Sequence, residues 1–235
     1  RAMASVETVP VGMRRMEREL RMVGKVQYNE TSLATISSRV EGYTERLYAD
    51  TTGLEVNAGD HLVDIYSPDL IVAQKEYLLA LADLGNAPLI ESARLKLLRW
   101  GLTDAQVKEL EQSRKLSERL TLFSPIKGTV TEKLIVQNSM VKPGEPLYRL
   151  ADLTSVWVAL DLYESDVAWV HYGQSATVTA EAYLGTTWTG RVWFISPVLT
   201  EESRTVKVLL NIANEDKKLK PGMYVGAVIH AGILA

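Results

Sequence analysis

Three methionines near the start of the chain are the side chains best suited to hold a soft metal ion. Met13, Met16 and Met22 lie close together in the sequence, and the thioether sulfur of methionine favours soft cations such as Cu(I). An ordinary packing role competes with this one. Met22 alternates with Gly24 and Val26 in a strand-like stretch, which suits a side chain that fills an apolar interior. The three methionines are therefore weak candidate metal ligands, and packing is the favoured interpretation.

Neither the histidines nor any cysteine adds a metal-binding or catalytic motif. The chain has no cysteine, which excludes disulfides, thiolate metal sites and cysteine nucleophiles. Its histidines are His61, His171 and His230, and their wide spacing matches neither H-x-x-H nor H-E-x-x-H. We expect them to be ordinary surface residues.

One group of carboxylates, Asp161, Glu164 and Asp166, is close enough in sequence to suggest acid–base chemistry. Glu164 and Asp166 also begin a short helical stretch, where negative charge is favoured by the helix dipole. That simpler explanation is preferred, so we predict neither enzymatic activity nor a bound cofactor.

The composition bounds the remaining classes. The chain has 235 residues, 46% hydrophobic, with a net charge of −3. It is apolar enough to form one or two cores, and it contains no basic run interleaved with aromatics of the kind that nucleic-acid binding needs. No window approaches the ~18 consecutive apolar residues of a membrane span. Because the chain opens on Arg1 without an apolar signal core, we expect a mature fragment whose export signal or anchor lies outside it.

The strongest pattern in the sequence is an internal repeat. Residues 56–65 read VNAGDHLVDI and residues 141–150 read VKPGEPLYRL. At identical spacing, Val56, Gly59, Asp60, Leu62 and Ile65 match Val141, Gly144, Glu145, Leu147 and Leu150. Upstream, Gly42 precedes Glu45-Arg46-Leu47 as Gly128 precedes Glu132-Lys133-Leu134, with small length changes. We infer a duplicated half-motif of strand, tight turn and strand.

Glycines mark the turns that we predict for this motif. Pro143-Gly144 suits the central positions of a type II turn, where glycine supplies the positive φ, and Ala58-Gly59 would do the same in the first copy. We assign Gly42, Gly59, Gly128 and Gly144 as structural turns of the duplicated motif.

Between the two copies the sequence predicts three short helices. Ser67 can cap a helix that begins at Pro68. A second helix starts near Pro88 and stops at Gly101, and Thr103 with Gln106 forms a capping box for a third. We expect a short three-helix bundle.

From Val156 onward the sequence becomes strand-like again, with several short strands between turn signals. These strands predict a small antiparallel β-barrel, which the N-terminal strands would complete. Its tryptophans, Trp157, Trp169, Trp188 and Trp193, fit strand packing, although one of them could face a neighbouring copy.

The fold class we predict is therefore mainly β with an α-helical insertion. The expected domains are residues 1–32, N-terminal strands of the barrel; 33–66 and 119–151, two halves that resemble a split lipoyl-like (barrel-sandwich hybrid) domain; 67–118, the helical insertion; 152–232, the β-barrel; and a last short segment, 233–235.

Duplicated, interlocking halves of this kind also build lipoyl and biotinyl carrier domains. Those carriers modify a lysine on the hairpin between the halves. Here the junction holds helices, and neither D-K-A nor M-K-M occurs anywhere in the chain. A covalent carrier remains an alternative, but a less favoured one.

Several segments resemble the periplasmic adaptors (membrane fusion proteins) of tripartite efflux pumps. Ser67–Ala80 (SPDLIVAQKEYLLA) and Leu97–Val107 (LLRWGLTDAQV) look like the helical domain of the heavy-metal branch. Leu153–Val158 (LTSVWV), Arg204-Thr205 and Leu219–Met223 (LKPGM) resemble the adaptor barrel. The resemblance covers essentially the whole chain, and it implies that residues 233–235 are the start of a truncated membrane-proximal domain.

The resemblance implies an adaptor that bridges an inner-membrane RND transporter and an outer-membrane channel, self-associates into a ring (hexameric by family analogy) and supports efflux of heavy-metal ions, Cu(I) and Ag(I) foremost. It implies the periplasm of a Gram-negative bacterium, with association to the inner membrane through segments not present in this chain. An adaptor for a drug or peptide export pump is the alternative. The Met- or His-rich extension that binds metal in that branch has no counterpart in this sequence, so metal specificity rests on overall similarity.

Overall fold

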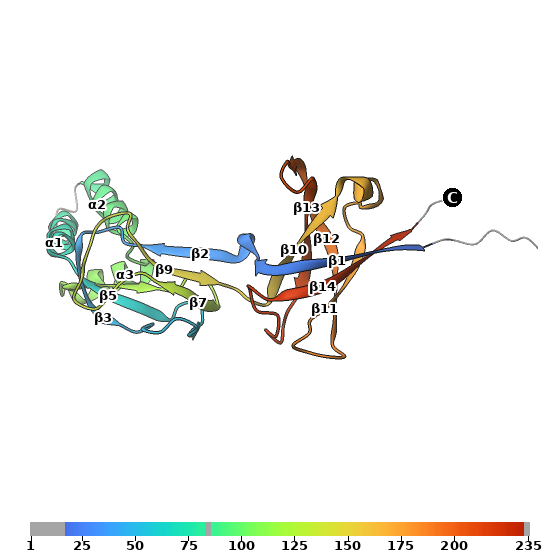
Figure 1. The fold of residues 1–235 in the computed structure, drawn as a ribbon. Helices are drawn as coiled ribbons and strands as arrows, with labels where there is room; N and C mark the ends of the chain where they lie inside the picture. Colours follow the sequence, from blue (N-terminus) through green and yellow to red (C-terminus); the bar gives the residue numbers. More distant parts are fainter. Residues whose placement is uncertain (1–16, 83–85, 233–235) are drawn as a thin grey trace, which may run out of the picture. The chain divides into compact units, whose positions relative to one another are not determined.

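The computed structural model describes residues 17–82 and 86–232, and these form two compact units (Figure 1). The first unit contains residues up to Gln27 together with those from Thr154 onward, and the second contains Tyr28–Leu153. We describe each unit by itself.

The first unit is a closed barrel of six strands. Its strands are β1 (Glu17–Tyr28), β10 (Ser155–Tyr163), β11 (Ser175–Thr179), β12 (Thr187–Thr200), β13 (Thr205–Ala213) and β14 (Tyr224–Gly232), in the order β1-β10-β13-β12-β11-β14. Strand β1 pairs antiparallel with β14, with Lys25 opposite Tyr224. Strand β1 thus closes the barrel between β10 and β14. The expected N-terminal strands span residues 1–32, and residues 1–16 of this range lie outside the described residues.

The barrel interior follows the alternation read from the sequence. Val156, Val158, Leu160 and Leu162 of β10 are all buried. A Cβ added to Gly24 of β1 would lie 2.5 Å from Leu160 Cδ2, so glycine permits the close approach of β1 to β10. The predicted short helical piece is a 3₁₀ helix, η2 (Glu164–Trp169).

The second unit contains a sandwich of two four-stranded sheets around one core. Its strands are β2 (Leu33–Ser37, preceded by the 3₁₀ turn η1, Glu30–Ser32), β3 (Gly42–Leu47), β4 (Glu55–Val56), β5 (His61–Tyr66), β6 (Arg119–Phe123), β7 (Gly128–Lys133), β8 (Met140–Val141) and β9 (Pro146–Ala151). The β2 sheet has the order β2-β9-β7-β4, and the β6 sheet has the order β6-β5-β3-β8.

The two strand orders are related by the sequence repeat. The first half contributes β2 to β5 and the second half contributes β6 to β9. If each strand is replaced by its counterpart in the other half, the strand order of the β2 sheet becomes that of the β6 sheet. Each sheet takes two strands from each half of the repeat. Neither half therefore completes a sheet by itself, and the halves are interlocked around a pseudo-two-fold axis.

Two of the four assigned glycines occupy turns. Gly59 and Gly144 have φ angles of 90° and 87°. Each turn is closed by a backbone hydrogen bond, from the N–H of Asp60 to the carbonyl of Asn57 and from Glu145 to Lys142, both 3.1 Å. The turn conformation needs a positive φ, which glycine adopts without strain.

The assignment of Gly42 and Gly128 as turn residues is wrong. They are the first residues of β3 and β7. A Cβ added to Gly42 would lie 2.2 Å from the carbonyl oxygen of Tyr66, and one added to Gly128 would lie 2.7 Å from that of Ala151. Glycine is required there because a neighbouring strand passes too close for any side chain.

The insertion consists of α1 (Pro68–Ala82), α2 (Ala87–Arg99) and α3 (Asp104–Ser113). The backbone N–H of Leu70 lies 3.4 Å from its acceptor Ser67 Oγ, and both hydrogen bonds of the Thr103–Gln106 capping box are present. No helix in the described ranges is both long and apolar enough to cross a membrane. The helices share one hydrophobic core with the sandwich, since Leu70, Tyr77, Leu97, Val107 and Leu110 belong to the same cluster as the strand residues.

Two polar side chains of α1 hold the insertion together, one bonding the segment that leads into β6 and the other bonding α3. The side-chain amide of Gln74 donates to the carbonyl of Ser117 (2.7 Å) and accepts from the N–H of Ser117 (2.9 Å). Tyr77, 1% exposed, donates to Glu111 Oε1 at 2.5 Å. Burial, reinforced by this hydrogen bond, raises the pKa of Tyr77 to about 12, and burial raises the pKa of Tyr148 to about 12.

Alanine at Gly42 should destabilise the second unit by about 1–3 kcal/mol, because the added methyl group overpacks the β3–β5 contact. Gly59→Asn is the matched control: its Cβ meets open space and asparagine tolerates the left-handed region, so the loss should stay below about 1 kcal/mol. The measurement is denaturant unfolding followed by circular dichroism at 222 nm, since α1 to α3 belong to the second unit. Equal losses for the two variants would contradict the close-approach explanation.

The second unit should lose stability as the pH rises from about 10 to about 12. A tyrosine whose pKa is raised on folding contributes stability that is complete below the unfolded-state pKa and is lost as the pH passes the folded-state pKa. For Tyr77 and Tyr148 these values are 10.0 and about 12. The free energy of unfolding, measured from pH 9 to 12, should fall less in Tyr77→Phe than in the unmodified chain. Tyr224→Phe, in the barrel, should leave the fall unchanged, and a fall equally steep in Tyr77→Phe would refute the assignment.

Candidate functional site

The structure places one of the three candidate methionines. Met22 is half-buried in β1 and packs against the barrel core, whereas Met13 and Met16 lie outside the described residues. Within the part of the chain that the structure describes, no three His, Cys, Asp or Glu side chains come together as a metal site. Metal binding by the methionines stays a prediction.

The three histidines have unrelated surroundings. The His61 ring lies between Tyr48 and Phe123, with centroid distances of 5.3 and 5.0 Å. His171 Nδ1 is 3.0 Å from its neighbour's carbonyl oxygen. His230 Nε2 is 3.1 Å from Thr177 Oγ1. Each ring therefore has its own local contacts.

The carboxylate group near η2 has a structural explanation. Glu164 and Asp166 lie in the first turn of η2. Asp166 Oδ1 pairs with Arg18 Nη2 at 2.8 Å, and the Arg18 guanidinium carbon lies 5.1 Å from the centre of the Trp169 ring. These contacts attach η2 to β1 of the barrel, and Asp161 lies opposite Lys207 in the β10–β13 ladder.

The barrel tryptophans divide by exposure. Trp157 and Trp188 are buried, whereas Trp193 is 45% exposed and its ring lies 6.1 Å from that of Tyr172. Trp193 falls at a register shift between β12 and β13, and such bulges redirect side chains.

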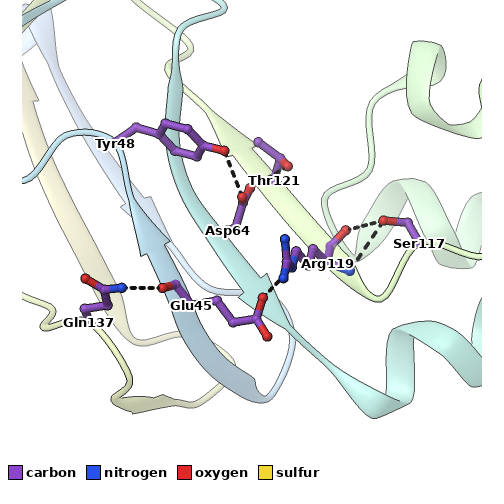
Figure 2. Close-up of polar contacts among 7 residues, drawn as sticks. All are labelled: Glu45, Tyr48, Asp64, Ser117, Arg119, Thr121 and Gln137. Carbon is purple, nitrogen blue, oxygen red and sulfur yellow. Dashed lines mark hydrogen bonds and ion pairs between the residues drawn. The ribbon is translucent and has the colours of Figure 1, made fainter.

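A polar cluster of the second unit lies on the outer face of the β6 sheet (Figure 2). Its centre is Asp64, which is only 6% exposed. Tyr48 Oη donates to Asp64 Oδ2 (2.9 Å) and Thr121 Oγ1 donates to Asp64 Oδ1 (2.7 Å). The hydrogen bond to the carboxylate, together with partial burial, raises the pKa of Tyr48. Both donors are needed, because a buried carboxylate without hydrogen bonds is costly.

A second group of contacts continues this face. Glu45, which falls at the register shift between Thr44 and Arg46 of β3, forms an ion pair with Arg119 of β6. Gln137 donates to the Glu45 carbonyl at 2.8 Å, and Ser117 Oγ donates to the Arg119 carbonyl at 2.8 Å (Figure 2). These contacts tie β3, β6 and the segments beside them into one rigid surface.

A groove of about 620 Å³ borders the face where α3 approaches β5 and β6. Gln106 and Glu109 of α3 form one wall, and His61, Arg119 and Thr121 line the other. The rings of His61 and Phe123, the Arg119 guanidinium and several polar side chains line this groove.

Sequence reasoning missed two paired serines and Asp64. Ser38 and Ser124 each accept a backbone hydrogen bond from the turn glycine of the other half, Gly144 or Gly59, at 2.8 Å. The sequence does contain a pattern that marks these two serines, because S-x-V-E-G at 38–42 and S-x-I-K-G at 124–128 have the same spacing. Asp64 gave no such signal, since its partners are 16 and 57 residues away.

This arrangement of barrel and interlocked sandwich can be compared with known families. A family model described as "CusB, barrel-sandwich hybrid domain" matches residues 33–151, and one described as "CusB-like, beta-barrel domain" matches residues 155–232. The two matches follow each other along the chain and cover both halves of the repeat, the helical insertion and five of the six barrel strands.

Curated relatives and a solved structure agree with the family models. The chain is 32% identical to the cation efflux system protein CusB of Escherichia coli (strain K12) over 199 residues, 84% of this chain and 49% of that protein. It is 25% identical to the cobalt-zinc-cadmium resistance protein CzcB of Cupriavidus metallidurans over 248 residues, 95% of this chain and 47% of that one. The crystal structure of ZneB from Cupriavidus metallidurans has the same fold, with a TM-score of 0.61, 24% identity and coverage of 92% of this chain and 99% of that chain.

A barrel-sandwich hybrid followed by a small β-barrel is the architecture of membrane fusion proteins, the adaptors of efflux pumps. The chain belongs to the CusB-like family of these adaptors. It spans about half the length of the curated relatives it matches.

Replacing Thr121 by valine should destabilise the second unit by about 1–3 kcal/mol, because Asp64 would lose one of its two donors while remaining buried. Thr35 occupies the equivalent position in the other half, opposite Arg149 as Thr121 is opposite Asp64. Thr35→Val should change stability by no more than about 0.5 kcal/mol. Denaturant unfolding followed at 222 nm measures both, and a neutral Thr121→Val would show that Asp64 does not depend on this bond.

Proposed function

We propose that this chain is part of a periplasmic adaptor that links an inner-membrane RND transporter to an outer-membrane channel for efflux of heavy-metal ions. The observation that carries the proposal is the match of two successive CusB-family domains to one interlocked sandwich and one barrel. CusB is named for cation efflux and CzcB for cobalt, zinc and cadmium resistance, and both names support a metal-ion substrate. We assign Cu(I) and Ag(I) as the substrates.

The function is mechanical rather than catalytic. The two sheets share a core with the helices, which gives a stiff element that can hold partner proteins at fixed positions. In this proposal several copies form a ring in the periplasm of a Gram-negative bacterium, and segments outside this chain attach it to the inner membrane. A covalent carrier is disfavoured because α1 to α3 occupy the junction where a carrier presents its lysine.

Deleting the gene in its own bacterium should lower tolerance to copper and silver severalfold, because the inner-membrane transporter would lose its connection to the outer-membrane channel. Growth inhibition by copper, silver, zinc, cobalt, cadmium and a panel of drugs is the measurement, with the wild-type gene returned on a plasmid as the control. Sensitivity to zinc, cobalt and cadmium alone would show that the substrates are divalent ions and not Cu(I) and Ag(I). Sensitivity to drugs alone would overturn the heavy-metal assignment.

A further inference from the structure

A cleft of about 930 Å³ lies where the two halves of the sandwich meet the connection between α2 and α3. Equivalent residues of both halves line it. Ile36 of β2 and Leu122 of β6 occupy the same position of the repeat, and the two turn glycines, Gly59 and Gly144, lie beside them. The volume falls within the range of about 300–1,000 Å³ that is usual for small-molecule sites.

The insertion supplies the remaining wall, and that wall is apolar. Leu98 and Leu102, at the end of α2 and just after it, line the cleft together with Gly101. A Cβ added to Gly101 would lie 3.7 Å both from Arg39 Cδ and from Leu122 Cδ2. The aliphatic stem of Arg39 therefore continues the apolar surface, as the stems of long cationic side chains commonly do.

Arg39 is the one charged side chain among the described residues that line the cleft. Its guanidinium has five N–H donors, and Nη1 donates to the carbonyl of Arg99 at 3.4 Å, which is long for such a bond. Arg39 forms no ion pair among the residues that the structure describes, and Asp104, at the start of α3, pairs with Arg94 instead. The cleft thus has apolar walls and a single cation.

The repeat shows that the fold does not need this cation. In the second half the position of Arg39 is taken by Pro125, within the matching segments SRVEG and SPIKG. The serine that precedes each of them makes the same contact, since Ser38 Oγ donates to the Val40 carbonyl at 2.6 Å and Ser124 Oγ to the Ile126 carbonyl at 2.7 Å. The turn therefore forms equally well without an arginine.

We propose that this cleft binds a single-chain carboxylate amphiphile, such as a medium-chain fatty acid. The chain lies on the apolar walls, where its burial supplies most of the affinity. The carboxylate accepts hydrogen bonds from the Arg39 guanidinium, whose planar fork matches a carboxylate. Such a ligand contacts both halves of the repeat and the insertion. Metal efflux requires no ligand of this kind, so the inference goes beyond the proposed function.

Isothermal titration of the whole chain with decanoate, below its critical micelle concentration, tests the proposal. Dodecanoate, two methylenes longer, should bind roughly tenfold tighter, because each buried methylene adds to the affinity. Decyltrimethylammonium has the same ten-carbon chain and a cationic head, and it should bind at least about tenfold more weakly because Arg39 repels it. Equal affinities for decanoate and decyltrimethylammonium would overturn the role of the carboxylate.

Three variants locate the site. Arg39→Gln should weaken decanoate binding roughly tenfold or more, because a hydrogen-bonded charge pair is lost. Lys127→Gln is the matched control: it removes a cation from an exposed position outside the cleft and should change the affinity less than about twofold. Ala105→Glu places a like charge in the cleft and should also weaken binding roughly tenfold, whereas glutamate in the first turn of α3 suits the helix.

Circular dichroism at 222 nm verifies that each variant is folded. A cation near a helix C-terminus is favourable, so Arg39 could serve only to hold α2. In that case Arg39→Gln would lower the stability and leave decanoate binding unchanged, and the proposal would be wrong. The absence of measurable binding by the unmodified chain at millimolar decanoate would also overturn it. These readouts use neither metal nor partner proteins, so their failure is distinct from a failure of the metal-tolerance experiment.

Discussion

The exchange of strands between the two halves of the repeat is the constraint on which the second unit depends. Strands β5 and β3 are adjacent to β6 and β8, and β2 and β4 are adjacent to β9 and β7, so every sheet requires both halves. The turn glycines also link the two halves, because the backbone N–H groups of Gly59 and Gly144 each donate to the backbone carbonyl of a serine in the opposite half. A half by itself would leave unpaired strand edges, which are costly when buried and prone to association when exposed.

This interlocking explains how a helical insertion is tolerated at the junction between the halves. The chain leaves the sandwich after β5 and returns at β6, and these two strands are hydrogen-bonded neighbours. The insertion therefore begins and ends at adjacent points of the sandwich. For the sandwich it is equivalent to a long loop whose two ends are held together by the β5–β6 pairing. Gln74 and Ser117 join α1 to the returning segment, and the buried helix residues extend the sandwich core. Through these contacts the insertion becomes part of the same unit.

A duplicated framework also separates structural from functional change. Both halves keep their core residues and their turn glycines, while the outer face of the β6 sheet carries the buried carboxylate of Asp64 and the rings of Tyr48, His61 and Phe123. The strand framework that both halves share therefore does not require these rings or this carboxylate.

Much of the architecture was determined by the sequence itself. The repeat, the three helix starts with their caps, and the alternating strands of the barrel depend on neighbours a few residues apart, and local patterns report such contacts directly. Gly42 and Gly128 were misread because their reason, a strand passing within van der Waals distance, comes from residues 24 and 23 positions further along the chain. The Asp64 cluster and the difference between the outer faces were decided only by the tertiary structure, because a pattern of alternation shows which residues face outward but not which of them meet across strands.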